Sequence, residues 1–131
     1  MKLNLLLLFI IPLFLISCGD DPLSKSELLL NSWILEETTL NGEEYYQEAL
    51  YFKGGVYSFY ADQTLQFVTS QNSNIINGTW QLKESETILS IAFSGVMYDY
   101  KIEKINSSSL WMSISNSEGD YFLKYSKVLL E

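Results

Sequence analysis

The chain contains one cysteine, Cys18, whose thiol is the only strong sulfur nucleophile in the sequence. Because there is no second cysteine, no disulfide framework competes for it. Lys2 gives the preceding segment a short positive start, and Leu5 to Ile16 is an apolar run interrupted only by Pro12. The run is shorter than the roughly 20 apolar residues that a membrane-spanning helix needs. Its length and flanks are typical of the hydrophobic region of a secretory signal peptide.

The four residues Leu15-Ile16-Ser17-Cys18 resemble the bacterial lipobox, with a large aliphatic residue three places before the cysteine and a small residue just before it. This resemblance implies that residues 1–17 are a lipoprotein signal peptide. It also implies that Cys18 carries thioether-linked diacylglycerol and that its new amine is acylated with a fatty acid such as palmitate. Two acyl chains already hold a protein stably at a bilayer. We therefore expect a lipid-anchored protein of the bacterial outer membrane that is periplasmic or surface-exposed, with the membrane as its partner.

Residues 18–23 are expected to form a polar tether, followed by one domain over 24–127 and a short tail over 128–131. In the Bacteroides and Flavobacterium groups, acidic residues just after the cysteine look like a surface-export signal, and Asp20 and Asp21 resemble it. The alternative is that they are two solvated linker charges.

Charge and residue types exclude several function classes. The net charge is −8, and loss of the leader would leave seven lysines against sixteen acidic residues, or −9. A nucleic-acid partner needs a cationic surface, which this chain does not offer. The absence of histidine removes the imidazole base and the usual zinc ligand. We interpret Glu36-Glu37 and Glu43-Glu44 as solvated charges, and predict no metal, no cofactor and no enzymatic activity.

The remaining sequence alternates between apolar and polar residues in short segments separated by turn formers, which is typical of half-buried strands. Ser24 and Glu27 have capping-box spacing and predict a short helix from Ser24 to Leu30. Glu43 to Lys53 is ambiguous between a short helix and a ragged strand. The eight predicted strands are Asn31 to Leu40, Val56 to Tyr60, Thr64 to Thr69, Asn77 to Lys83, Thr87 to Ser94, Met97 to Ile105, Leu110 to Ser115 and Tyr121 to Lys127.

Such a series of strands hides its edges best by closing on itself. We therefore predict an all-β fold, an up-and-down antiparallel eight-stranded barrel with a short N-terminal helix, and keep a two-sheet sandwich as the alternative. In the first strand, Trp33 and Leu35 are predicted to face inward and Glu36 and Thr38 outward. The predicted interior is Trp33, Leu35, Tyr57, Phe59, Leu65, Phe67, Trp80, Leu82, Leu89, Ile91, Phe93, Tyr98, Tyr100, Ile102, Leu110, Met112, Ile114, Tyr121, Leu123 and Tyr125.

Several short motifs follow one another along Leu28 to Lys127. They are Leu28-Leu29-Leu30 with Trp33 and Leu35, Val56-Tyr57-Ser58-Phe59-Tyr60-Ala61-Asp62, Gly78-Thr79-Trp80-Gln81-Leu82, Ile88-Leu89-Ser90-Ile91, and Tyr100-Lys101-Ile102 with Leu110. In this order they resemble the small lipocalin-like lipoprotein domains of Bacteroides-type bacteria. The sequence departs from that family at Asn31, where the family usually has glycine, and at Asp62-Gln63, where it usually has Asp-Gly. The resemblance implies a barrel with a ligand-type cavity and implies no reaction.

Five predicted interior residues are tyrosines, and a buried hydroxyl without a partner costs about 1–3 kcal/mol. We expect these hydroxyls to reach a barrel mouth, water or a ligand, with Tyr57, Tyr98, Tyr100 and Tyr121 near an open end and Trp33 sealing the other end. The predicted binding residues for a small apolar or amphipathic ligand are Tyr57, Phe59, Phe67, Trp80, Tyr98, Tyr100 and Tyr121.

Two functions remain open from the sequence. The first is a ligand-binding module with a cavity inside the barrel. Large residues at every second position are also compatible with a filled core, which would leave no such cavity. The second is a solid-core structural or protein-interaction module, such as an inhibitor or accessory subunit of an envelope complex. An exposed aromatic patch would favour the second, and its candidate residues are Tyr45, Tyr46, Tyr51, Phe52 and Trp111.

Overall fold

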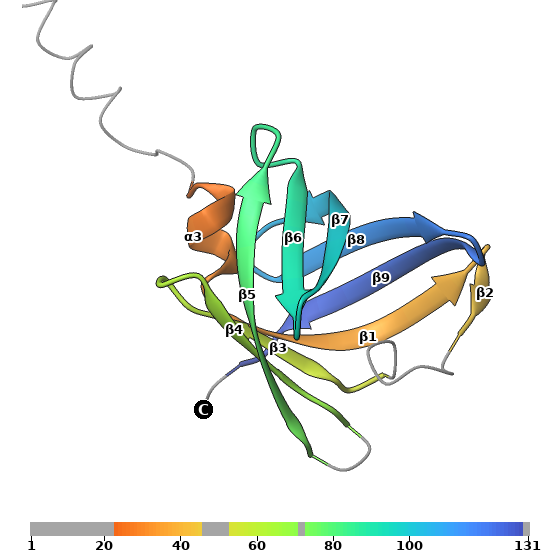
Figure 1. Cartoon of the computed structure of the whole chain (residues 1–131), viewed down its shortest axis with the longest axis horizontal. Coiled ribbons are helices and arrows are strands. Elements are labelled where there is room, and N and C mark those ends of the chain that lie inside the picture. Colours follow the sequence, from red (N-terminus) through yellow and green to blue (C-terminus); the bar gives the residue numbers. More distant parts are fainter. Residues whose placement is uncertain (1–22, 46–52, 71–72, 130–131) are drawn as a thin grey trace, which may run out of the picture.

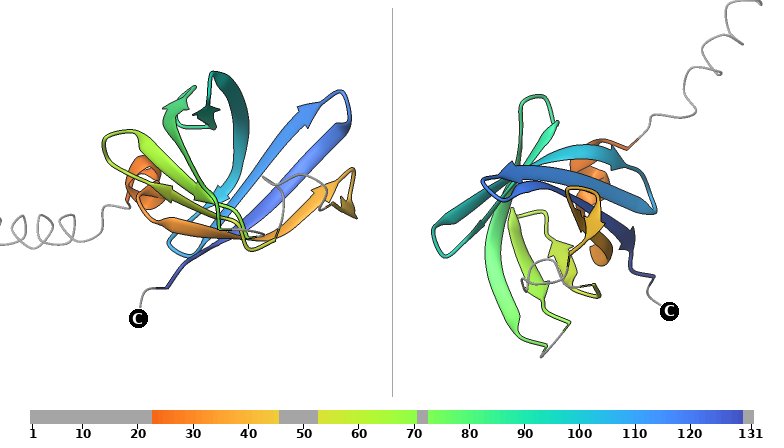
Figure 2. Two further views of the ribbon diagram at one scale, coloured as in Figure 1. Left: turned by 60° about the horizontal axis from the view of Figure 1, so that its bottom comes forward. Right: turned by 90° about the vertical axis from the view of Figure 1, so that its right-hand side faces the viewer.

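The computed structural model describes residues 23–45, 53–70 and 73–129, and within them the chain forms one short helix and nine strands (Figure 1). Neighbouring strands pair antiparallel in the order β2-β1-β3-β4-β5-β6-β7-β8-β9, and β1 also pairs with β9. This last pairing closes an eight-stranded barrel, as predicted, and leaves the two-residue β2 as a flap on β1 (Figure 2). The elements are α3 (Lys25–Leu29), β1 (Ser32–Leu40), β2 (Glu43–Glu44), β3 (Val56–Phe59), β4 (Thr64–Val68), β5 (Ile75–Lys83), β6 (Ile88–Phe93), β7 (Val96–Ile105), β8 (Ser109–Asn116) and β9 (Gly119–Lys127).

The helix α3 lies across one end of the barrel, the left end in Figure 1. Its start is fixed by the predicted capping box, because the Ser24 side chain accepts from the Glu27 N–H and the Glu27 side chain accepts from the Ser24 N–H. Leu29 is fully buried in the core, and its carbonyl accepts a hydrogen bond from Trp33 Nε1 at 3.2 Å. We call this the covered end, and Trp33 lies there as the sequence predicts.

Two of the tight turns contain residues with a left-handed backbone. Asn41 and Gly42 both have positive φ, 52° and 87°, which is the geometry of a type I′ hairpin turn between β1 and β2. Gln63 also has positive φ, 69°, in the β3–β4 hairpin where a glycine would be easier. Asp62 supports that turn by accepting hydrogen bonds from the Thr64 N–H at 3.0 Å and the Thr64 hydroxyl at 2.6 Å.

One prediction for β1 is wrong. The register of β1 against β9 shifts between Leu35 and Glu37, so the bulge places one extra residue on β1. Every residue beyond the bulge then changes face. As a result Thr38 points into the barrel and is fully buried, although simple alternation from Trp33 assigns it to the outside.

All twenty predicted interior residues lie in or against the core. Sixteen are buried, and Leu82, Tyr98, Ile102 and Ile114 are partly buried and packed against them. The centre is rich in ring contacts: the Tyr57 ring lies 4.6 Å from the Phe67 ring, 6.3 Å from Phe93 and 5.7 Å from Tyr125, measured between centroids. Offset and edge contacts of this kind add to area burial in stabilising a core.

Of the ambiguous segment from Glu43 to Lys53, the structure describes β2, Tyr45 and Lys53, and 46–52 lies outside the described residues. Tyr46, Tyr51 and Phe52 of the predicted aromatic patch belong to that segment. The first residue of the predicted tail, Val128, is still paired with β1, because its N–H donates to the Ser32 carbonyl at 2.8 Å.

Candidate functional site

The end of the barrel opposite α3 carries the β1–β2 turn and the β8–β9 turn, which lie at the right in Figure 1. Within the part of the chain that the structure describes, no helix covers it. We call it the uncovered end. Its polar side chains include Thr38 of β1, Tyr121 of β9 and Tyr45, which follows β2.

Tyr121 is the best-defined polar group of the uncovered end. Its ring is buried, and its hydroxyl donates to the Glu118 carboxylate in the β8–β9 turn. That hydrogen bond raises the pKa of the Tyr121 phenol above its ordinary value of 10.0, and burial and a hydrogen bond with Tyr45 raise it further. The Tyr45 ring meets the Tyr121 ring edge-on, with centroids 5.3 Å apart. The phenol therefore stays a neutral donor whose position is set by a carboxylate and a second tyrosine.

Thr38 presents a polar atom that the fold does not satisfy. Its side chain is fully buried, and among the described residues its Oγ1 has no hydrogen-bond partner. Its backbone is well fixed, because Thr38 lies opposite Leu123 in the β1–β9 pairing and its carbonyl accepts from the Tyr45 N–H at 3.0 Å. Leaving such a hydroxyl without a partner costs about 1–3 kcal/mol. A water or the polar group of a ligand at this place would recover that cost.

The structure places the seven predicted binding residues in several ring contacts. Tyr98 and Tyr100 share β7, with stacked rings 6.3 Å apart, and Tyr98 is half-buried while Tyr100 is fully buried. Trp80 is tied to the covered end, where its Nε1 donates to the Tyr60 carbonyl of the β3–β4 hairpin at 3.0 Å. Its ring meets Phe59 edge-on at 5.8 Å.

The other predicted binding residues lie either in the central ring cluster or at the uncovered end. Tyr57 and Phe67 belong to the central ring cluster already described, and Phe59 joins that cluster to Trp80. Tyr121 is tied to the uncovered end by the hydrogen bond from its hydroxyl to Glu118 in the β8–β9 turn.

Sequence reasoning missed Thr38 and Glu118. The bulge that turns Thr38 inward leaves no mark in the alternation of residue types, since Glu36, Glu37, Thr38 and Thr39 are all polar. Glu118 could have been found, because a two-residue turn between paired strands brings the residue before Gly119 close to the first inward side chain of β9.

Two grooves formed by described residues lie on the outer surface of the barrel. One, of about 500 Å³, lies beside the end of α3 and includes Leu30, Tyr60 and Leu129 in its lining. The other, of about 310 Å³, lies over β5, β6 and β7 and is lined by Thr79, Gln81, Ser90 and Met97 among others.

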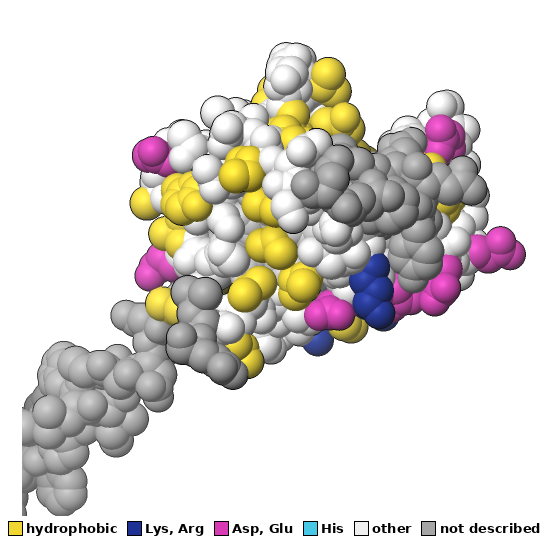
Figure 3. Space-filling model, turned by 90° about the horizontal axis from the view of Figure 1, so that it is seen from below, with side chains coloured by type: hydrophobic (Ala, Val, Ile, Leu, Met, Phe, Trp, Pro, Cys, Tyr) yellow, Lys and Arg dark blue, Asp and Glu magenta, His cyan; other side chains and the backbone are white. Residues whose placement is uncertain are grey.

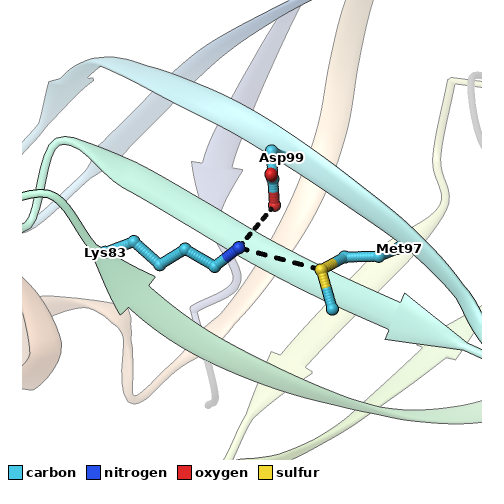
Figure 4. A network of polar contacts seen from close by, with 3 residues as sticks. All are labelled: Lys83, Met97 and Asp99. Carbon is cyan, nitrogen blue, oxygen red and sulfur yellow. Dashed lines mark hydrogen bonds and ion pairs between the residues drawn. The ribbon is translucent and has the colours of Figure 1, made fainter.

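Next to the second groove is a small polar network (Figure 4). Lys83 Nζ lies 3.3 Å from Asp99 Oδ1 and 3.7 Å from Met97 Sδ. A hydrogen bond from Ser90, and then the neighbouring Lys83, hold the pKa of Asp99 below its ordinary value. The network is half-exposed, and such pairs contribute little to stability.

The described residues hold no group of three or more histidine, cysteine, aspartate or glutamate side chains placed to bind a metal ion. Within the same residues, none of the helical structure has the length and hydropathy of a membrane-crossing helix.

No protein-family model matches the chain, and no curated protein matches its sequence. Among solved structures, the chain is similar to a lipocalin-like protein from Bacteroides uniformis ATCC 8492, with a TM-score of 0.58 and 16% sequence identity. The alignment covers 77% of this chain and 99% of the other. At this level of identity the likeness concerns the fold: the chain forms a lipocalin-like barrel, closed, antiparallel and eight-stranded, with one short helix.

Proposed function

We propose that this protein is a lipid-anchored barrel of the bacterial envelope that binds one small amphipathic molecule at its uncovered end. Lipocalin-like barrels are a binding architecture, since eight strands enclose an interior just wide enough for side chains or one small ligand. The proposal concerns binding and includes no reaction.

The observation that carries this proposal is the buried Thr38 hydroxyl, which has no partner among the described residues and lies next to the end of the barrel that no described helix covers. Two further polar groups, the Tyr121 phenol and the Glu118 carboxylate, lie at the same end. Partly buried apolar side chains, including Leu40 and Ile114, flank them. A ligand with a hydroxyl, amide or ammonium head and an apolar body matches this mixture.

The anchor is part of the proposal. The lipobox-like residues before Cys18 support removal of residues 1–17 and acylation of the cysteine in the outer membrane. The test is the mass of the N-terminal peptide of protein purified from its own host, with and without the change Cys18→Ser. Acylated Cys18 in the natural chain is expected, and an unmodified thiol on a chain that stays in the aqueous phase without detergent would contradict it.

A second candidate function rests on a different observation. The ring contacts of Tyr57 with Phe59, Phe67 and Tyr125 fill the centre of the barrel, which suits a solid structural or protein-interaction module. The aromatic patch expected for that role is not assembled from the residues that the structure describes. Tyr45 packs against Tyr121 at the barrel end, whereas Trp111 lies beside Phe122, with the ammonium groups of two lysines over its ring at 4.3 and 4.7 Å.

Native mass spectrometry of the barrel, purified from its host with the acyl chains removed, separates the two functions. Binding predicts a mass excess that disappears on denaturation and a small molecule in the organic extract. A bare barrel that instead purifies with one envelope protein supports the second function and contradicts the first.

A further inference from the structure

The covered end carries an exposed apolar patch beside the end of α3, the helix that follows the tether. We define the tether-side patch as Leu30, Tyr60, Val128 and Leu129, which surround the groove of about 500 Å³. Leu129 is 82% exposed, Tyr60 45% and Leu30 38%. Figure 3 shows the molecule from below: on this face, hydrophobic side chains are scattered among uncharged polar ones, and most of the acidic ones lie toward the edges of the view.

The tether fixes which end of the barrel meets the bilayer. Leu23 directly precedes the capping residue of α3, and only four residues separate it from Cys18. An extended chain spans at most about 3.6 Å per residue, so the Leu23 Cα is held within roughly 18 Å of the Cys18 Cα. The covered end must therefore lie close to the lipid headgroups.

The chemistry of the patch suits a bilayer surface better than a polar ligand. The hydroxyls of Ser32 and Ser58 in the groove hydrogen-bond each other at 2.7 Å, so each already has one partner. Leucine side chains with a tyrosine ring are the usual residues at a membrane interface. Lys127 also lines the groove, where its apolar stem can follow the patch while its ammonium group reaches phosphate.

We propose that the tether-side patch docks on the surface of the bilayer in which Cys18 is anchored, so that the barrel lies on the membrane with its uncovered end toward solvent. This inference rests on the proposed lipid anchor. Exposed acidic groups, Glu27 on α3 and Asp62 in the β3–β4 hairpin, flank the patch. Because they repel an anionic surface, the bilayer that the patch fits is zwitterionic.

The test uses the chain from Cys18 onward, with this sole cysteine coupled to a maleimide phospholipid in phosphatidylcholine nanodiscs that carry gadolinium on some headgroups. The synthetic link makes the result independent of natural acylation, which the peptide mass described above tests separately. The amide signals of Leu30, Tyr60 and Leu129 should broaden strongly, and those of Gly42 and Gly119 at the uncovered end should stay sharp.

Two triple variants complete the design. The variant Leu30→Ser, Tyr60→Ser, Leu129→Ser should lower the ratio of docked to undocked barrel by about tenfold, because three apolar side chains lose their burial. The matched control Ile75→Ser, Val96→Ser, Met97→Ser changes the remaining strongly exposed apolar side chains of the barrel body and should dock like the natural chain. If the first variant unfolds, Leu129→Ser alone, at the most exposed position, should give a smaller loss.

Four results would overturn the proposal. The first two are equal broadening of the amide signals at both ends of the barrel and an equal loss of docking in the two triple variants. The other two are stronger docking when anionic lipid is added and dimerisation of the unanchored chain through the tether-side patch. The last would assign the patch to a second copy of the chain.

Discussion

The two ends of the barrel differ in how their buried polar atoms are hydrogen-bonded. At the covered end, the indole N–H groups of Trp33 and Trp80 both donate to backbone carbonyls, of Leu29 and Tyr60. At the uncovered end, the buried Thr38 hydroxyl has no partner among the described residues. A protein interior satisfies its buried polar atoms almost everywhere, so an exception marks a place built for something other than stability. The comparison supports the proposal that the covered end is structural and that the uncovered end binds a ligand.

The largest effect should come from opening the covered end with Trp33→Ala. Trp33 is fully buried, and replacing a buried tryptophan by alanine costs about 3–5 kcal/mol. The free energy of unfolding, measured by urea titration, should fall by that amount. The control is Trp111→Ala on the half-buried outer face, which should cost clearly less. Equal losses would mean that the covered end is not the packed end.

At the uncovered end, Thr38→Val should raise the free energy of unfolding instead of lowering it. Valine has the shape of threonine without the hydroxyl, so the change removes a buried polar atom without a partner and should raise the free energy of unfolding by about 1 kcal/mol. Thr39→Val, one residue along and outside the barrel, is the matched control and should leave stability almost unchanged. A loss of stability on Thr38→Val would show that the hydroxyl is satisfied in the natural protein.

The Tyr121 phenol gives the uncovered end a pH dependence. Its pKa is raised in the folded chain, so the folded state holds this proton more tightly than the unfolded state does. The resulting stabilisation is complete below the unfolded pKa of 10.0 and is lost as the pH rises above it. Unfolding measured between neutral pH and pH 11 should therefore show falling stability. Tyr121→Phe should flatten this part of the curve, and an unchanged slope would contradict the assignment.

At neutral pH, Glu118→Gln should cost about 1 kcal/mol, since a neutral acceptor replaces a charged one in the bond to Tyr121. The alkaline absorbance change of the tyrosines tests the same bond. One tyrosine should ionise earlier in the variant than in the natural chain, and identical titrations would remove Glu118 from the site.

The smallest effect is expected at Asp62 in the hairpin of the covered end. Hydrogen bonds from the Thr64 hydroxyl and N–H hold the pKa of this exposed carboxyl below its usual 3.8. Its contribution is present above that pH and is lost as the pH falls through the lowered pKa. Carboxyl NMR titration should show Thr64→Val moving the midpoint back toward 3.8, with little change in the unfolding curve at neutral pH.

The fold was predictable because strand alternation and turn residues agree along most of the chain. The interior residues from Tyr57 to Tyr125 were placed correctly, since period-two burial leaves a direct mark on residue types. Thr38 was not, because a bulge among consecutive polar residues reverses the faces without changing their pattern.

The candidate site was predictable only in part. Tyrosine content pointed to buried hydroxyls, and Tyr121 does lie at the uncovered end. Trp80 was grouped with it because both face inward, yet facing inward does not say which end of the barrel a residue occupies. That depends on strand tilt and on where α3 packs, which are properties of the closed barrel and not of any single strand.

The most direct measurement is ligand retention by two neighbouring variants, Thr38→Val and Thr39→Val, purified from the host and compared by native mass spectrometry. The natural chain and Thr39→Val should carry the same added mass, and Thr38→Val should lose most of it while remaining folded. Equal retention by all three proteins, or a bare barrel in each, would contradict binding at the uncovered end.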